Sequence, residues 1–102
     1  MSDVRVFKLI TGEEILAEVV RDDTETLGQV VIQNVLQLVM QQTQQGVGIG
    51  VFPWGAHILE PTITLDTTLH IIYSGKAKEE LVKIWTQAFS PLALPKSSLL
   101  VG

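Results

Sequence analysis

The sequence predicts a mainly β fold, in which a small, strongly bent antiparallel barrel of five strands is followed by one C-terminal α-helix. Short apolar, β-branched runs fill most of the chain, and glycine or polar turn residues separate them, as is typical of short antiparallel strands. After Gly75 the apolar residues recur at helical spacing instead. We therefore expect a single domain over residues 1–102, with the barrel at about 4–74, the helix at about 76–89 and an apolar tail at 90–102.

The first two strands are expected at residues 4–10 and 15–21, joined as a hairpin over Gly12. A tight turn between two strands requires a positive φ, which glycine adopts without strain. Residues 22–26 are acidic or carry hydroxyl groups, and such side chains compete for backbone hydrogen bonds. They predict a polar loop after the second strand.

The middle of the chain predicts a long third strand and a glycine-rich fourth strand. The third strand covers residues 30–40, and at this length it is expected to bend and to serve two sides of the barrel. A glutamine-rich turn follows at residues 41–46. In residues 47–52 glycine alternates with apolar residues, which places glycine on one face of the strand.

An aromatic loop at residues 52–57 precedes the last expected strand, which covers residues 63–73 with a kink at 66–68. The helix that follows has one apolar face, made by Ala77, Leu81, Ile84, Trp85 and Ala88. Ser74 is a candidate N-cap, and Pro91 prevents the helix from continuing. The tail is too apolar for a typical disordered segment, so we expect it to pack on its own barrel or on a neighbouring chain.

Composition restricts the classes of partner. Hydrophobic residues make up 46% of the chain and charged residues 18%, so a domain of this size leaves apolar surface that favours subunit contacts. The net charge of −4 argues against duplex DNA and anionic membranes. The chain has no cysteine, hence no disulfide or thiolate metal site, and no signal peptide or membrane span is evident. A soluble cytoplasmic protein is expected.

The first hairpin resembles the first signature of the Sm-like (LSm) family, whose fold is an SH3-like barrel. In that signature a Leu, a turn Gly, three apolar or small residues and an Asp recur at the spacing found here for Leu9, Gly12, Ile15, Ala17, Val19 and Asp23. The resemblance implies a homo-oligomeric ring, in which the fourth strand of one subunit pairs with the fifth strand of the next. The corresponding candidate interface residues are Val47, Ile49, Val51, Phe52, Leu69, Ile71 and Tyr73. A helix after the last strand is similar to the arrangement in short Sm-like proteins from phages and marine bacteria.

The resemblance also implies a site for single-stranded RNA at two loops that face the pore of the ring. Asp23 matches the Asp of the family's first loop, whereas Leu27 stands where the family has Asn. Gly55 matches the glycine of the second signature, and Trp54 stands where the family has Arg. A rival placement of that signature at residues 73–75 also lacks the Arg. The candidate RNA-binding residues are Asp23, Trp54, Gly55 and His57.

Two alternatives stay open at this point. Trp54 can stack on a nucleobase, or it can anchor a core or a subunit interface together with Phe52; His57 can contact RNA or simply lie on the surface. The leading hypothesis is a non-catalytic RNA-binding module, and the alternative is a ring-forming scaffold with no nucleic-acid role. No nucleophile motif and no set of three metal ligands is apparent, so we expect no enzyme activity, cofactor or metal.

Overall fold

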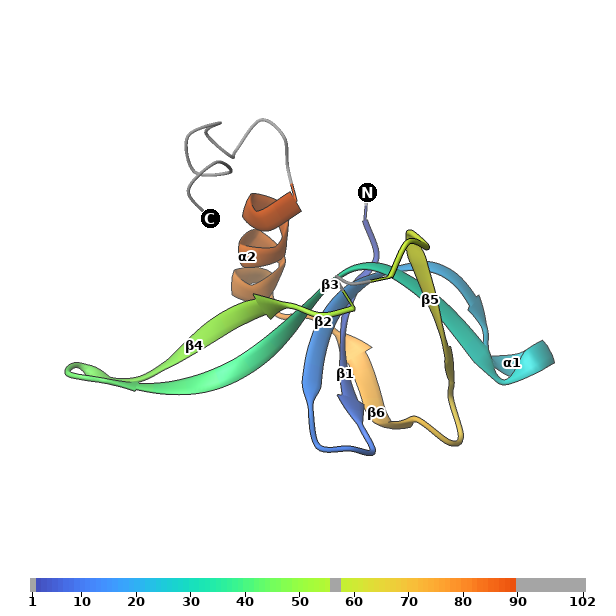
Figure 1. The fold of residues 1–102 in the computed structure, drawn as a ribbon, viewed down its shortest axis with the longest axis horizontal. Coiled ribbons are helices and arrows are strands. Elements are labelled where there is room, and N and C mark those ends of the chain that lie inside the picture. Colours follow the sequence, from blue (N-terminus) through green and yellow to red (C-terminus); the bar gives the residue numbers. More distant parts are fainter. Residues whose placement is uncertain (1, 56–57, 90–102) are drawn as a thin grey trace.

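The computed structural model describes residues 2–55 and 58–89, whose backbone forms an antiparallel six-stranded sheet and a C-terminal helix (Figure 1). The elements follow one another in the order β1 (Val4–Leu9), β2 (Glu14–Asp23), α1 (Thr24–Leu27), β3 (Gln29–Thr43), β4 (Gly46–Pro53), β5 (Thr62–Asp66), β6 (Ile71–Lys76) and α2 (Glu79–Phe89). The mainly β class and the C-terminal helix are therefore confirmed.

The closed five-stranded barrel is wrong, because the sheet has six strands and remains open. Its strands lie in the order β4-β3-β2-β1-β6, and β5 pairs with β3 beside β4. The expected last strand, at residues 63–73, is divided into β5 and β6 by a turn. In this turn the Asp66 carboxylate accepts hydrogen bonds from the backbone N–H groups of Thr68 and Leu69, both at 2.8 Å. The turn carries the chain from the edge of β3 to the edge of β1, so β5 and β6 do not close the sheet.

The predicted bend of the third strand is confirmed, and it occurs at Asn34. Residues 29–33 of β3 pair with β5, whereas residues 36–43 pair with β4 on the same edge. Asn34 lies between the two segments with a φ of 52°, a left-handed conformation that Asn tolerates better than most residues. Its carbonyl accepts a hydrogen bond of 2.7 Å from the Trp85 indole of α2, which ties the bend to the helix.

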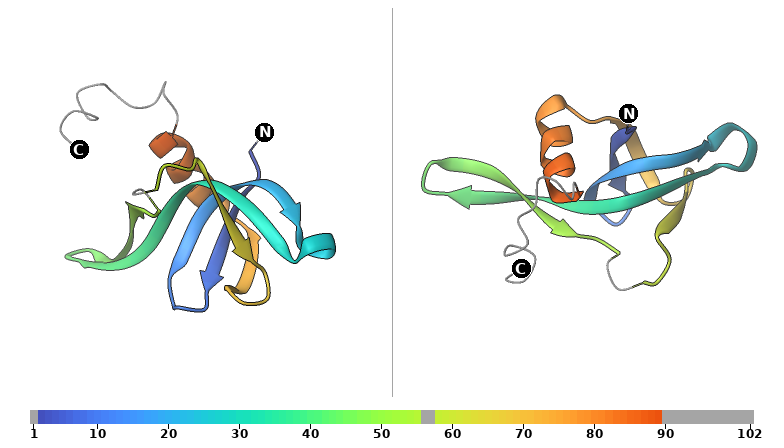
Figure 2. Two further views of the ribbon diagram at one scale, coloured as in Figure 1. Left: turned by 45° about the vertical axis from the view of Figure 1, so that its right-hand side comes forward. Right: turned by 90° about the horizontal axis from the view of Figure 1, so that it is seen from above.

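Apolar side chains cover both faces of the sheet. In β2 the neighbouring residues Ile15 and Leu16 are both completely buried, although they point to opposite faces. The first core contains Phe7, Leu9, Ile15, Ala17, Val30, Ile32, Val35 and Leu65. The second core, beneath α2, contains Val4, Leu16, Leu36 and Trp85. Figure 2 shows α2 on this face, close to the point where β3 and β4 extend away from the rest of the sheet.

Of three local features predicted from the sequence, one is confirmed and two differ in the structure. Gly12 has a φ of 105° and turns the first hairpin as predicted. The loop expected at residues 22–26 is instead the end of β2 and the single-turn helix α1, whose first N–H donates to the Asp22 carboxylate. Ser74 lies within β6 and does not cap α2, because pairing of β6 with β1 continues to Lys76.

Among the described residues, no helix is long and apolar enough to cross a membrane. The apolar tail at 90–102, which is expected to pack on the barrel or on a neighbour, lies outside the described residues.

Candidate functional site

Two loops meet at the end of the sheet that carries Asp23. The carbonyl of Gly28, which ends α1, accepts hydrogen bonds from both the backbone N–H and the hydroxyl group of Thr67, at 2.8 and 3.0 Å. Asp23, Gln29 and Asp66 form one row across β2, β3 and β5. The loop around α1 and the turn between β5 and β6 therefore form one surface, which we call the paired loops (residues 23–28 and 66–70).

The paired loops are acidic, and the cations close to them are already engaged. Arg21 forms an ion pair with Asp23, and Arg5 forms one with Asp22 at 3.0 Å. Hydrogen bonds from Thr24 and Arg5 lower the pKa of Asp22. The backbone N–H groups of the turn that follows Asp66 lower the pKa of that carboxyl in the same way. At neutral pH these carboxylates are ionised, so the loops can accept N–H groups from a nucleobase but repel phosphate.

Trp54 does not lie with Asp23. Its indole N–H donates a hydrogen bond of 3.1 Å to Glu13 in the turn of the first hairpin, and its half-buried ring packs against the first core. Together with a stronger effect from Thr11, this bond lowers the pKa of Glu13. The backbone of Trp54 is bonded to Val35, beyond the bend of β3, whereas Asp23 pairs with β3 at its first residue. The structure thus favours the packing interpretation of Trp54.

The other two RNA-binding candidates are Gly55 and His57. Gly55 has a φ of 71°, a left-handed conformation that favours glycine, and a Cβ at this position would lie 2.7 Å from the terminal methyl group of Ile63, which would have to move. His57 lies outside the described residues.

Both outer strands of the sheet, β4 and β6, expose large apolar side chains. Of the predicted interface residues, those that are about half exposed or more are Val47, Ile49, Phe52, Leu69 and Tyr73. Val51 packs against the second core and Ile71 against the first. Ile72 on β6 is 61% exposed but was not among the predicted interface residues. Its side chain alternates with those of Ile71 and Tyr73, the two neighbours that were predicted.

The absence of charged residues around the β4 edge is visible in the sequence but was not used in predicting the interface. Residues 26–59, a third of the chain, include no Asp, Glu, Lys or Arg. Natural edge strands are usually protected from other strands by charged side chains, proline or bulges. Apart from Pro53 at its end, β4 has none of these residues, and its pairing with β3 shows no bulge. The β4 edge is therefore suited to pairing with another strand.

The two faces of this extended hairpin, which we call the arm (residues 36–53), differ sharply. The register places Met40 opposite Ile49 on the face that continues the second core toward solvent. On the opposite face Gly48 and Gly50 leave the backbone bare, and the Gln41 side chain lies over Gly50. The predicted separation of glycine from apolar residues is confirmed, and the apolar face lies on the same side as α2.

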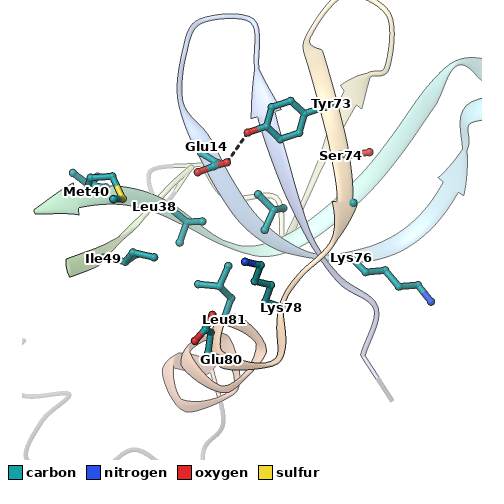
Figure 3. Close-up of a pocket in the computed structure, with 13 residues that line it drawn as sticks. Glu14, Leu38, Met40, Ile49, Tyr73, Ser74, Lys76, Lys78, Glu80 and Leu81 are labelled. Carbon is teal, nitrogen blue, oxygen red and sulfur yellow. Dashed lines mark hydrogen bonds between the residues drawn. The ribbon is translucent and has the colours of Figure 1, made fainter. Parts of the chain in front are cut away.

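A groove with a volume of about 410 Å³ lies between the arm, β6 and the first turn of α2 (Figure 3). Val6, Leu38 and Leu81 are among its apolar lining residues. The Tyr73 hydroxyl group donates a hydrogen bond of 2.8 Å to Glu14 across the groove, which raises the pKa of Tyr73. Figure 3 shows the Lys78 ammonium group pointing into the groove.

Comparison with known proteins adds no assignment, since neither a family model nor a curated protein matches the chain. Among the described residues no three His, Asp or Glu side chains lie close enough together to hold a metal ion. The candidate surfaces are thus the paired loops, the two outer strand edges and the groove between them.

Proposed function

We propose that this protein is a non-catalytic, Sm-like subunit that assembles with copies of itself into a ring and binds single-stranded RNA. The spacing of the first hairpin and the order of the strands support the resemblance on which this proposal rests. Assembly joins the β4 edge of one copy to the β6 edge of the next.

The uncharged β4 edge is the single observation that carries the assembly. Backbone N–H and C=O groups along an outer strand pair readily with another strand unless something blocks them. Val47 and Ile49 on β4, and Ile72 and Tyr73 on β6, provide apolar area that such pairing would bury. Because the two edges lie at opposite ends of the strand order, each copy offers a different edge to each neighbour, and this head-to-tail contact generates rings when the rotation closes.

The paired loops support the RNA-binding part of the proposal. In the family that the chain resembles, RNA is held by the loop after the second strand together with a later loop. Here the bond from Thr67 to Gly28 brings the loop after β2 against the turn after β5. Asp23 and the backbone of this surface can read the edge of an unstacked base.

A scaffold without a nucleic-acid role is the second candidate, and the charge of the paired loops favours it. Asp23 and Asp66 lie in these loops and Asp22 directly precedes them, and the two nearby arginines are engaged in ion pairs. In this alternative the ring binds proteins through its exposed apolar side chains.

Native mass spectrometry of the full chain, with and without a short oligouridine, tests the proposal. We expect a discrete multiple of the chain mass that gains the mass of the RNA. Ile49→Asp should reduce the assembly to smaller species, because it places a charge on the pairing edge. Val20→Asp is the matched control, since Val20 is similarly exposed but lies on β2 and not on β4 or β6, the two strands whose edges are proposed to pair.

Each outcome decides one part of the proposal. A wild-type chain that remains monomeric at micromolar concentration contradicts the ring. A ring that gains no RNA mass contradicts RNA binding and leaves the scaffold. Equal effects of Ile49→Asp and Val20→Asp contradict the assignment of the β4 edge.

A further inference from the structure

The two neighbours of β3 on one edge leave a gap between them at the bend of this strand. The pairing with β5 ends at Gln33 and the pairing with β4 begins at Leu36, so residues 34–35 lie between the two strands. A cavity with a volume of about 290 Å³ lies at this position, and residues 88–89 at the end of α2 form one side of it. We call this cavity the notch. Its apolar lining includes Pro53, Trp54, Pro61, Ile63 and Phe89.

The apolar surface of the notch continues beyond the cavity. In the loop that leads to β5, Leu59 is completely exposed and Ile58 is 48% exposed. The two aromatic side chains of the lining belong to different cores, because Trp54 packs against the first core and Phe89 against the second. An uncovered apolar area of this kind favours contact with an apolar partner.

The chain itself supplies an apolar segment at the same place. The tail (residues 90–102) follows Phe89 directly and contains Leu92 and Leu94 close to its beginning. At about 3.4 Å per extended residue, these two leucines can reach points within about 10 and 17 Å of Phe89. Both are therefore tethered close to the notch.

Prolines favour an extended conformation for the first part of the tail. Pro91 and Pro95 have a fixed φ, and each restricts the residue before it to extended backbone. A segment that is restricted before it binds loses less entropy on binding. Extended segments that contain proline dock into grooves lined by aromatic side chains, and Trp54 and Phe89 both line the notch.

The charges of the notch and the tail are complementary. Among the described residues that line the notch, the one charged side chain is that of Glu60, which is exposed. The one charged side chain in the tail is that of Lys96, which follows Pro95 directly. A tail that crosses the notch can therefore bring its cation to the carboxylate of Glu60.

We propose that the notch binds the tail of the same chain, with Leu92 and Leu94 in the cavity and Lys96 facing Glu60. The tail then joins the end of α2 to the loop between β4 and β5. The inference does not depend on the ring or on RNA binding, because it uses one chain only. It is compatible with the ring, since Pro53, the last residue of β4, is the one described lining residue that belongs to a strand proposed to pair with another copy.

The test uses the full chain and a fluorescently labelled peptide with the sequence of residues 90–98. Leu92→Ser/Leu94→Ser removes the two anchors, and Leu99→Ser/Leu100→Ser is the matched control with the same change further along the tail. A tethered segment acts at an effective concentration of about 1 mM, so the tail of the wild type should exclude the peptide from the notch. We expect the anchor variant to bind the peptide at least about tenfold more tightly than the wild type or the control, as measured by anisotropy.

Hydrogen exchange measures the notch directly. The backbone N–H of Trp54 donates to the carbonyl of Val35 at 3.1 Å. We expect this N–H to exchange faster in the anchor variant than in the control, because the tail no longer covers it. Lys96→Glu keeps both leucines and reverses the charge that faces Glu60, and it should have a smaller effect in the same direction. Circular dichroism checks the fold of each variant.

Three results would overturn the proposal. If the anchor variant binds no peptide at about 1 mM, the affinity is too low for the tail to fill the notch at its effective concentration. If the wild type binds the peptide as tightly as the anchor variant does, the tail of the same chain does not occupy the notch. If the N–H of Trp54 exchanges faster on dilution of the wild type or in Ile49→Asp, a neighbouring copy supplies the tail and the assignment to the same chain is wrong.

Discussion

The two tryptophans show how differently one residue type is used in this fold. Trp85 is 7% exposed, and its indole N–H donates to the carbonyl of Asn34 inside the second core. Trp54 is only half-buried and donates to a carboxylate that water can also reach. A hydrogen bond lost from a buried site leaves its partner unsatisfied, whereas water replaces one lost at the surface. The same substitution should therefore have unequal costs at the two positions.

We predict that Trp85→Phe lowers the free energy of unfolding by about 2 kcal/mol, because it leaves the Asn34 carbonyl without a donor and removes packing volume. Trp54→Phe should cost less than about 1 kcal/mol, because water can replace the bond to Glu13. Urea unfolding followed by circular dichroism measures both values. Equal losses at the two positions would contradict the described roles of the two rings.

At the scale of elements, the arm combines a bare glycine face with an apolar face. Its glycines are not equivalent. Gly46 has a φ of 123° in the turn between β3 and β4, whereas Gly48 has ordinary strand geometry, and a Cβ there would meet only the Thr43 methyl group at 3.8 Å. Gly48 is therefore a position where a side chain fits without strain.

We predict that Gly48→Ala stabilises the arm by about 0.4–1 kcal/mol, because alanine restricts the unfolded chain and meets no obstacle in the strand. Gly46→Ala should destabilise it by about 1 kcal/mol, since alanine is strained at positive φ. Hydrogen exchange of the backbone N–H groups of β4 measures the local effect. Slower exchange in Gly46→Ala than in Gly48→Ala would overturn the argument.

Local features of the fold could be predicted from the sequence, whereas closure and the site could not. The turn at Gly12 and the bend of β3 follow from residues close together in the chain. Whether the sheet closes depends on the turn after Asp66. After this turn β6 pairs with β1 and not with β5. Likewise, Trp54 is hydrogen-bonded to Glu13, which lies 41 positions away in the sequence. Asp23 lies in one row with Asp66, at the start of a turn that is also distant from it in the sequence. Propensity and spacing contain no direct information on such distant pairs.

Across the described residues, the fold stabilises the ionised form of three acidic side chains. Glu13, Asp22 and Asp66 all have lowered pKa values, because hydroxyl, indole or backbone groups donate hydrogen bonds to their carboxylates. These bonds favour the ionised form in the folded state. Protonation must therefore cost stability.

We predict that the free energy of unfolding falls when the pH is lowered below about 4, the ordinary pKa of these side chains. The sign follows from linkage: the folded pKa lies below the unfolded one, so the contribution is fully present above the unfolded value and is lost as the pH falls through the folded value. Urea midpoints at pH 7, 5 and 3 measure the effect. The double variant Asp22→Asn/Asp66→Asn should show a smaller decrease than the wild type, and an equal decrease would contradict the assignment.

The uncharged segment at residues 26–59 also has a consequence for how the protein must be produced in a cell. Under the proposed assembly, a newly synthesised copy that has not yet met its neighbours exposes the same β4 edge to every other unfinished chain. Correct assembly and aggregation then compete for one set of backbone groups, and both become faster as the concentration rises. No charged gatekeeper residue within the segment slows the wrong reaction. In the proposed ring, rapid burial of the edge by a correctly placed neighbour is then the main protection against insoluble material.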